Sequence, residues 1–152
     1  MKFSAQRPVR IVMIGAGGTG GHVAPHLYRM LHSLERPCRF IIIDGDIVEE
    51  KNLLRQNFTA ADLGRNKAQV LAERYSAVFG MPCEYIPEYM EDEERLARLV
   101  RPAYLQNGIG FCNGRMYADT CYELVILIGC VDNNKSRQLC DPVFRTVTPL
   151  VY

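Results

Sequence analysis

The sequence predicts an α/β fold in which a mainly parallel sheet is covered by helices on both faces. Short apolar runs rich in β-branched residues end at glycine or aspartate, and such runs are typical of fully buried strands. Segments with apolar residues at helical spacing separate these runs. Alternating strands and helices imply right-handed crossovers between parallel strands, and a chain of 152 residues suits one domain.

The first strand and helix are predicted from the start of the chain. Residues 9–14, VRIVMI, predict a buried strand that stops at glycine. Residues 15–21, GAGGTGG, predict a glycine-rich turn, and residues 22–34 carry apolar side chains at helical spacing. Pro25 would lie in the first turn of this helix, where its missing N–H is tolerated.

The middle of the chain continues the alternation. Gly80 is expected to close a helix, and Pro87 weakens the strand in which it lies. Acidic residues begin the last helix of this part, as the helix dipole favours. The predicted elements are strand 39–44, helix 65–79, strand 83–89 and helix 91–100.

The last third of the chain is predicted less evenly. Residues 102–119 contain three glycines and show no clear period, so they predict a loop or flap. Residues 124–132 predict the most strongly apolar strand, and a short helix over 134–140 follows. The final run, 147–152, resembles a strand cut at its last residue, so we expect a chain truncated at its C-terminal end.

Composition excludes several classes of protein. The formal net charge of +1 gives no basic surface for nucleic acid, and no apolar run is long enough to span a membrane. The six cysteines are scattered and form no CxxC pair, which predicts reduced thiols in a cytoplasmic protein. The first residues lack the apolar core of a signal peptide.

A nucleotide-binding pattern follows the first strand. Gly15, Gly17 and Gly20 have the spacing of the fingerprint in which glycines let phosphate approach a helix N-terminus, so the doubly wound sheet is predicted to be Rossmann-like. Asp44 ends the second strand, where a carboxylate can bind ribose hydroxyls. The alternative is that the glycine turn only lets a helix pack on the sheet.

A second polar group follows Asp44 and differs from what a dinucleotide alone requires. Asn52, Arg55 and Gln56 supply donors and a fixed positive charge, and Lys67 opens a helix soon after. Phosphoryl and nucleotidyl transfer need such charge on the phosphate oxygens. Asp132, after the strongest strand, can hold Mg²⁺. The alternatives are a surface ion pair for Arg55, a solvated Lys67 and a helix-capping Asp132.

Four strings in this order resemble the ThiF/MoeB/HesA family of adenylyltransferases: GAGGTGG, DGDIVEEKNLLRQNF, GRNKA and CVDNNKSRQ. Ubiquitin-activating enzymes share the core of this family. The resemblance covers most of residues 9–152, and it implies that 1–152 form the N-terminal portion of a longer family domain. The string GHVAPHLYRM further resembles ThiF-like proteins of bacterial mobile or plasmid-borne gene clusters, such as the PRTRC system.

The resemblance implies ATP- and Mg²⁺-dependent adenylation of the C-terminal carboxylate of a ubiquitin-like or sulfur-carrier protein by a homodimer. It assigns catalysis to Arg55, Lys67 and Asp132, and Mg²⁺ to Asp132. Asp46 is expected to orient Arg55 or its loop. The resemblance assigns ATP contacts to Gly15, Gly17, Gly18, Gly20, Asp44, Asp46, Asn52, Arg55, Gln56 and Lys67.

Two departures and two competing functions remain. The family's zinc-binding CxxC pairs are absent, and its N-terminal arginine that reaches a partner's ATP has no clear counterpart in Arg7 or Arg10. An NAD-dependent oxidoreductase would explain Gly15–Gly20 and Asp44 but not residues 52–56. A module that holds a nucleotide and docks a partner without chemistry would explain both.

Overall fold

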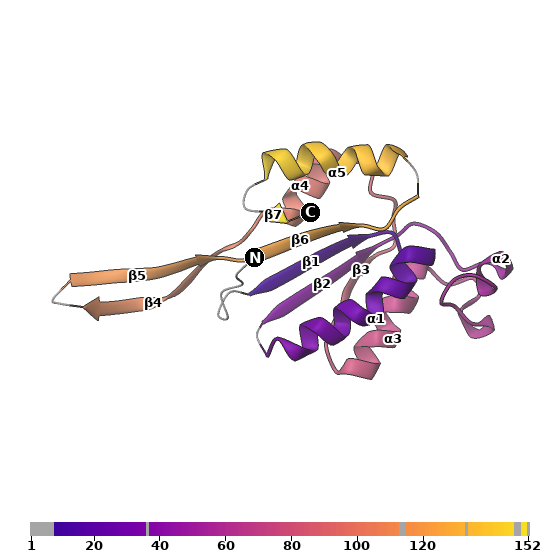
Figure 1. Ribbon diagram of the computed structural model, residues 1–152, viewed down its shortest axis with the longest axis horizontal. Coiled ribbons are helices and arrows are strands. Elements are labelled where there is room, and N and C mark those ends of the chain that lie inside the picture. Colours follow the sequence, from indigo (N-terminus) through magenta and orange to yellow (C-terminus); the bar gives the residue numbers. More distant parts are fainter. Residues whose placement is uncertain (1–7, 36, 113–114, 133, 148–149, 152) are drawn as a thin grey trace.

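The computed structural model describes residues 8–35, 37–112, 115–132, 134–147 and 150–151. The chain alternates strands and helices along most of its length (Figure 1). The elements are, in order, β1 (Val9–Ile14), α1 (Gly18–Ser33), β2 (Cys38–Ile43), α2 (Glu50–Leu53), the 3-10 helix η1 (Ala60–Asp62), α3 (Lys67–Phe79), β3 (Glu84–Ile86), α4 (Glu93–Val100), β4 (Tyr104–Cys112), β5 (Arg115–Tyr122), β6 (Leu124–Gly129), α5 (Asn134–Thr146) and β7 (Leu150–Val151).

The five-stranded main sheet has the strand order β3-β2-β1-β6-β7, and its strand pairs are parallel. The chain runs outward from β1 to β3, then returns to place β6 on the other side of β1. This reversal confirms the predicted doubly wound, Rossmann-like α/β fold. Helices α1 and α3 cover one face, and α4 and α5 cover the other (Figure 1).

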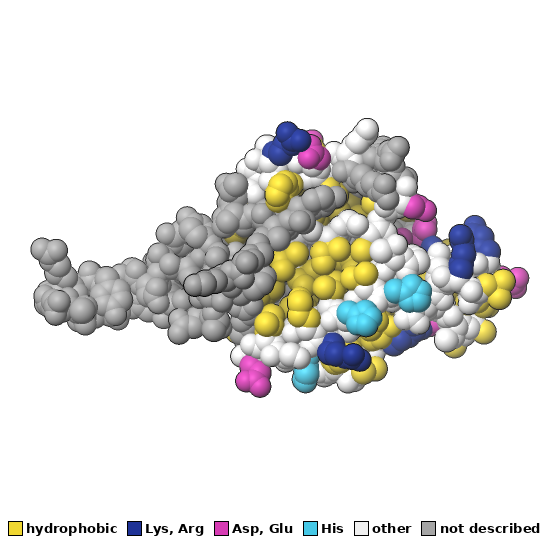
Figure 2. Space-filling view, viewed as in Figure 1, with side chains coloured by type: hydrophobic (Ala, Val, Ile, Leu, Met, Phe, Trp, Pro, Cys, Tyr) yellow, Lys and Arg dark blue, Asp and Glu magenta, His cyan; other side chains and the backbone are white. Residues whose placement is uncertain are grey.

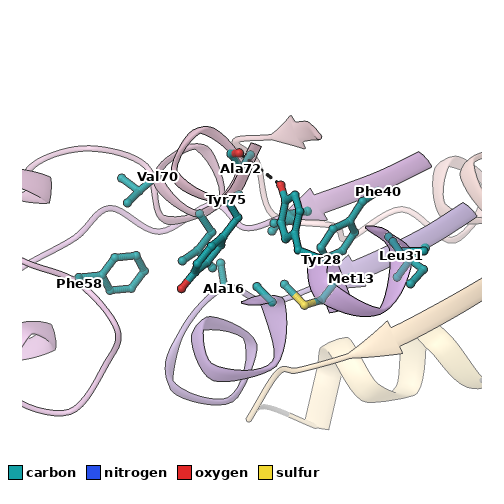
Figure 3. Packing of buried hydrophobic residues seen from close by; sticks show 14 of the residues in the cluster. Met13, Ala16, Tyr28, Leu31, Phe40, Phe58, Val70, Ala72 and Tyr75 are labelled. Atoms are coloured by element: carbon teal, nitrogen blue, oxygen red, sulfur yellow. Dashed lines mark hydrogen bonds between the residues drawn. The ribbon is translucent and has the colours of Figure 1, made fainter. Parts of the chain in front are cut away.

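An aromatic cluster fills the core beneath α1 and α3. The fully buried ring of Tyr28 meets Phe40 edge-on, with ring centroids 5.0 Å apart, and stacks on Phe79 at 5.8 Å. Its hydroxyl donates a hydrogen bond to the Ala72 carbonyl at 3.3 Å (Figure 3). Burial raises the pKa of Tyr28, so this phenol stays neutral and serves the packing of the two helices.

The same face of the sheet is less well covered at β6. Leu124, Ile126 and Ile128 pack against the cluster but are only partly buried, as is Leu27 of α1. A hydrophobic area lies over this part of the molecule in the space-filling view (Figure 2). On the opposite face, Val125 and Leu127 are fully buried under the other pair of helices.

Helix α1 begins earlier than predicted, and Pro25 therefore lies inside it and not in its first turn. Proline has no N–H, so the carbonyl four residues before it, that of Gly21, lacks its helical donor. The side-chain amide of Asn57 donates to this carbonyl at 3.2 Å and to the Tyr75 hydroxyl at 2.7 Å. A side chain from the loop after α2 thus replaces the missing helical hydrogen bond.

The predicted loop over 102–119 is wrong, because the structure has an antiparallel hairpin of β4 and β5 that projects from the main sheet (Figure 1). Glycines hid the strand pattern, although Asn-Gly, which occurs twice in this part of the sequence, is a strong hairpin signal. The register shifts between Gln106 and Gly108, as at a β-bulge. Glycine permits such an irregularity in a strand.

A buried ion pair fixes the base of this hairpin. The guanidinium of Arg10 donates from Nε to Glu123 at 3.0 Å and from Nη1 to the Leu99 carbonyl at 2.6 Å. The Glu123 carboxylate also accepts from the Ala103 N–H at 3.3 Å. Arg10 is thereby committed to internal contacts, so it does not extend toward a second subunit.

Several boundaries also differ from the prediction. Strand β3 stops before Pro87, which cannot donate to a neighbouring strand. Helix α5 is longer than the predicted 134–140 and continues through Pro142. The predicted Gly80 cap is confirmed by its left-handed backbone, with φ of 62°. Within the part of the chain that the structure describes, no helix is long and apolar enough to cross a membrane.

Candidate functional site

A cavity of about 710 Å³ opens where β1, β2 and β6 end at their carboxyl sides. The strand order reverses at this point, and α/β sheets bind ligands in the crevice formed there. The residues lining the cavity are Ile14, Gly15, Gly17, Gly18, Thr19, Ile43, Asp44, Gly45, Asp46, Arg55, Gln56, Lys67, Glu88, Tyr89, Met90, Glu91, Cys130, Val131 and Asp132.

The glycine turn is required by close backbone packing. Gly15 has φ of 98°, and a Cβ placed there would lie 2.7 Å from the Cys130 carbonyl oxygen. A Cβ at Gly20 would lie 2.0 Å from the Gly15 carbonyl oxygen, so α1 can approach the turn only with glycine there. At the cavity side, a Cβ at Gly18 would meet open space.

The N-terminus of α1 therefore faces the cavity with its first N–H groups available. Gly17 is the N-cap residue and has no side chain to accept a hydrogen bond from these groups. Free N–H groups and the positive end of the helix dipole favour an anion at such a position. The predicted phosphate loop has a suitable shape and polarity.

Asp44 joins the glycine turn to the end of β2. Its Oδ2 accepts from the Ala16 N–H at 2.5 Å, and its Oδ1 accepts from the Asp46 N–H at 2.8 Å. Burial raises the pKa of this carboxyl, and the two backbone hydrogen bonds oppose that effect. Each carboxylate oxygen can accept more than one hydrogen bond, so the group can also accept from ribose hydroxyls.

Asp46 pairs with Lys67 and not with Arg55, so the structure contradicts one of its two expected roles, the orientation of Arg55. Lys67 Nζ lies 2.9 Å from Asp46 Oδ2, and the Tyr89 hydroxyl donates to Asp46 Oδ1 at 2.5 Å. The hydrogen bond from Tyr89, followed by the ion pair with Lys67, lowers the pKa of Asp46. The Asn66 amide donates to the carbonyls of Asp44 and Asp46, which fixes this segment against the start of α3.

Arg55 and Gln56 both line the cavity, although the Arg55 side chain is exposed. Asn52 lies behind them, and its buried Oδ1 accepts from the Glu49 N–H at 2.9 Å in the capping box of α2. The Asn52 carbonyl accepts from the N–H groups of Arg55 and Gln56. In this structure Asn52 shapes the turn that presents these two side chains and does not itself line the cavity.

Gln56 carries a buried side-chain acceptor next to the glycine turn. Its buried Oε1 has no hydrogen-bond partner within the described residues, and the carboxamide lies next to the glycine turn, 3.8 Å from a Cβ placed at Gly17. A buried acceptor without a donor is unfavourable by about 1–3 kcal/mol. A ligand hydroxyl or a ligand-bound water would supply the missing donor.

Asp132 lines the cavity just after β6. No group of three or more potential metal ligands was found among the described side chains. Mg²⁺ commonly uses one or two carboxylates and completes its octahedron with phosphate oxygens and water. A single carboxylate such as Asp132 is compatible with a site of this kind, and among the described residues it is not part of an all-protein metal cage.

One group of residues that forms a wall of the cavity was not predicted from the sequence. Glu88, Tyr89, Met90 and Glu91 line it directly after β3. The predicted strand 83–89 placed the first two of these residues inside the sheet. Pro87 was the available signal, because a proline that ends a strand starts the loop carrying this wall.

The ThiF family model matches residues 4–151 of this chain. No curated protein matches the sequence. Among solved structures, E. coli MccB with ATP is 27% identical, with a TM-score of 0.50 over 61% of this chain and 27% of that one. E. coli MccB with MccA is 28% identical, with a TM-score of 0.50 over 60% and 27%. TcdA (CsdL) shares the fold at 20% identity, with a TM-score of 0.64 over 93% and 47%.

Proposed function

The chain belongs to the ThiF family, and from this premise we propose that it activates a carboxylate by adenylation with ATP. The main support for this proposal is that the residues suited to binding a nucleotide line a single cavity. The glycine turn, Arg55, Lys67 and Asp44 line it together. We assign the first three to the phosphates and Asp44 to the ribose. The resemblance to MccB, which was solved with ATP, supports ATP as the nucleotide.

In the proposed reaction a carboxylate oxygen attacks the α-phosphorus, and pyrophosphate leaves with the bridging oxygen and its electron pair. Negative charge increases on the phosphate oxygens during this displacement. In this proposal Arg55 and Lys67, which line the cavity, and the N–H groups of α1 stabilise that charge. Asp132 would hold Mg²⁺, which when bound neutralises the phosphate oxygens.

The proposed substrate is the C-terminal carboxylate of a ubiquitin-like or sulfur-carrier protein, and the proposed state is a cytoplasmic homodimer. A similar protein, MccB, was solved together with MccA, which is a precedent for a second molecule bound to such a domain. The chain spans 27% of the MccB chain and 47% of the TcdA chain. The proposal places nucleotide activation in the part of the domain that this chain contains.

The test is ATP–pyrophosphate exchange with Mg²⁺ and a candidate carrier protein ending in glycine. Arg55→Ala and Asp132→Ala should each reduce exchange by at least about tenfold, since each removes a charged contact worth about 1.5–3 kcal/mol. Arg98→Ala is the matched control, because Arg98 forms an exposed ion pair on α4. Normal exchange in both cavity variants would contradict the proposal.

Calorimetric titration with ATP and NAD distinguishes the competing functions. Binding of ATP with exchange supports adenylation. Binding of ATP without exchange for each carrier tested supports a nucleotide-holding docking module. Binding of NAD without ATP supports an oxidoreductase, and it would leave the position of Arg55 and Lys67 in the cavity without a chemical role.

A further inference from the structure

The ring of Tyr89 occupies the space that a side chain at position 45 would fill. A Cβ placed at Gly45 would come within 2.6–2.8 Å of the Tyr89 ring atoms Cδ2, Cγ and Cε2. Such a distance is too short for any residue but glycine unless the ring moves. The ring therefore lies against the backbone between Asp44 and Asp46, at the edge of the cavity.

The orientation of this ring is fixed at its hydroxyl. Tyr89 donates to Asp46 Oδ1 at 2.5 Å, and Lys67 holds the other oxygen of the same carboxylate at 2.9 Å. Tyr89 nevertheless remains 65% exposed and lines the cavity. One face of a fixed aromatic ring thus lies on backbone, while much of the remaining surface is open to a ligand.

Asp44 shows what part of a ligand would reach this ring. Its carboxylate lines the cavity and is the proposed partner of the ribose hydroxyls, and Gly45 is the next residue along the chain. A nucleobase is bonded directly to the ribose, so it would lie beside the ribose site. The phosphates would point the other way, toward the glycine turn and Arg55.

We propose that the open face of Tyr89 is the stacking surface for the nucleobase, an inference that rests on nucleotide binding in this cavity. An aromatic side chain presents a π-face to a planar base, and its removal weakens binding by roughly 5- to 150-fold per stacked base. Gly45 leaves room for the ring, and the bond to Asp46 sets its orientation.

The main experiment measures binding of ATP and of inorganic tripolyphosphate to three variants by calorimetry. Tyr89→Leu should weaken the binding of ATP by roughly 5- to 150-fold and leave the binding of tripolyphosphate unchanged, because only ATP has a base. Tyr89→Phe should keep affinity within a few fold of wild type, since the ring remains. Tyr85→Leu is the matched control, because Tyr85 is exposed on β3 and does not line the cavity.

Each contrary result has a defined meaning. Unchanged ATP affinity in Tyr89→Leu overturns the inference but leaves adenylation intact. Equal loss in Tyr89→Phe and Tyr89→Leu assigns the effect to the hydroxyl, and equal loss of tripolyphosphate assigns it to the phosphate side; either overturns stacking. If wild-type protein does not bind ATP, the proposed function fails together with the inference.

A fluorescent variant gives an independent readout. The chain contains no tryptophan, so Tyr89→Trp introduces a single indole at the proposed stacking surface. Stacking by the base should quench its emission when ATP is added, whereas tripolyphosphate should leave it unchanged. Binding of ATP to this variant without a change in emission would overturn the inference.

Discussion

The two ends of the main sheet each carry a cation with little exposed surface, but the two cations have different partners. At the N-terminal end of β1, Arg10 and Glu123 pair with side chains 9% and 7% exposed. At the carboxyl ends of the strands, Lys67 is 6% exposed, while its partner Asp46 is 48% exposed and lines the cavity.

This difference separates an ion pair that holds the fold from one that can serve a ligand. Arg10 and Glu123 pair with each other and form hydrogen bonds with the backbone at the base of the hairpin, so both side chains are held in place. Asp46 can be hydrated if Lys67 turns to a phosphate. Exposure of the carboxylate therefore leaves the lysine charge available at low energetic cost.

The largest effect is expected for Glu123→Gln. This substitution leaves the Arg10 guanidinium buried without a counter-charge, which should lower the free energy of unfolding by about 3–5 kcal/mol. Urea titration measures the loss. Glu84→Gln breaks the exposed pair with Arg39 and should change stability by about 0–1 kcal/mol. Similar effects of the two substitutions would refute the distinction.

Lys67→Met should affect the binding of ATP more than the stability of the fold. If Lys67 contacts phosphate as proposed, its loss should weaken the binding of ATP by about 1.5–3 kcal/mol, which is roughly a 10- to 150-fold increase in Kd. Stability should fall less than in Glu123→Gln, because water can solvate the half-exposed Asp46 left behind. Calorimetry and urea titration report the two quantities. A stability loss as large as that of Glu123→Gln would make Lys67 a structural residue.

The smallest effect concerns the titration of Asp46. Its pKa lies below the ordinary value of 3.8, first because Tyr89 donates a hydrogen bond to its charged form. A carboxyl with a depressed folded pKa stabilises the fold above the unfolded pKa, and this contribution is lost as pH falls through the folded pKa. Tyr89→Phe should raise the pKa of Asp46 in the folded protein, and the loss of stability at acidic pH that is due to Asp46 should then be smaller.

The measurement is carboxyl NMR titration of labelled aspartate, with urea titrations across the same acidic range. Tyr85→Phe provides the control, since Tyr85 lies on β3 away from the cavity lining. An unmoved Asp46 midpoint in Tyr89→Phe would show that Lys67, and not the phenol, sets the charge of this carboxylate.

The parts of the fold that obey local rules were predictable from sequence. The glycine turn follows from backbone geometry at Gly15 and Gly20, and β1 and β2 follow from short runs that are apolar apart from one arginine each. The hairpin was missed because glycines removed the alternating pattern of its strands. The base of that hairpin could not be inferred, because Arg10 and Glu123 lie 113 positions apart.

The candidate site divides in the same way. Asp44 and Arg55 belong to one of the family-like strings and Lys67 to the next, and the structure brings all three to one cavity. Tyr89 has no such string, and its place depends on a missing side chain at Gly45. The pairing of Asp46 with Lys67 also required the fold, since either cation was compatible with the spacing.

The carboxamide of Asn57 links three parts of the molecule. It completes α1 at the proline, bonds the Tyr75 hydroxyl and follows directly after Gln56 in the chain. Loosening of the aromatic core would thus be transmitted to the ligand-facing loop through two hydrogen bonds. A single amide group therefore connects the interior packing to the loop that carries Gln56 at the cavity.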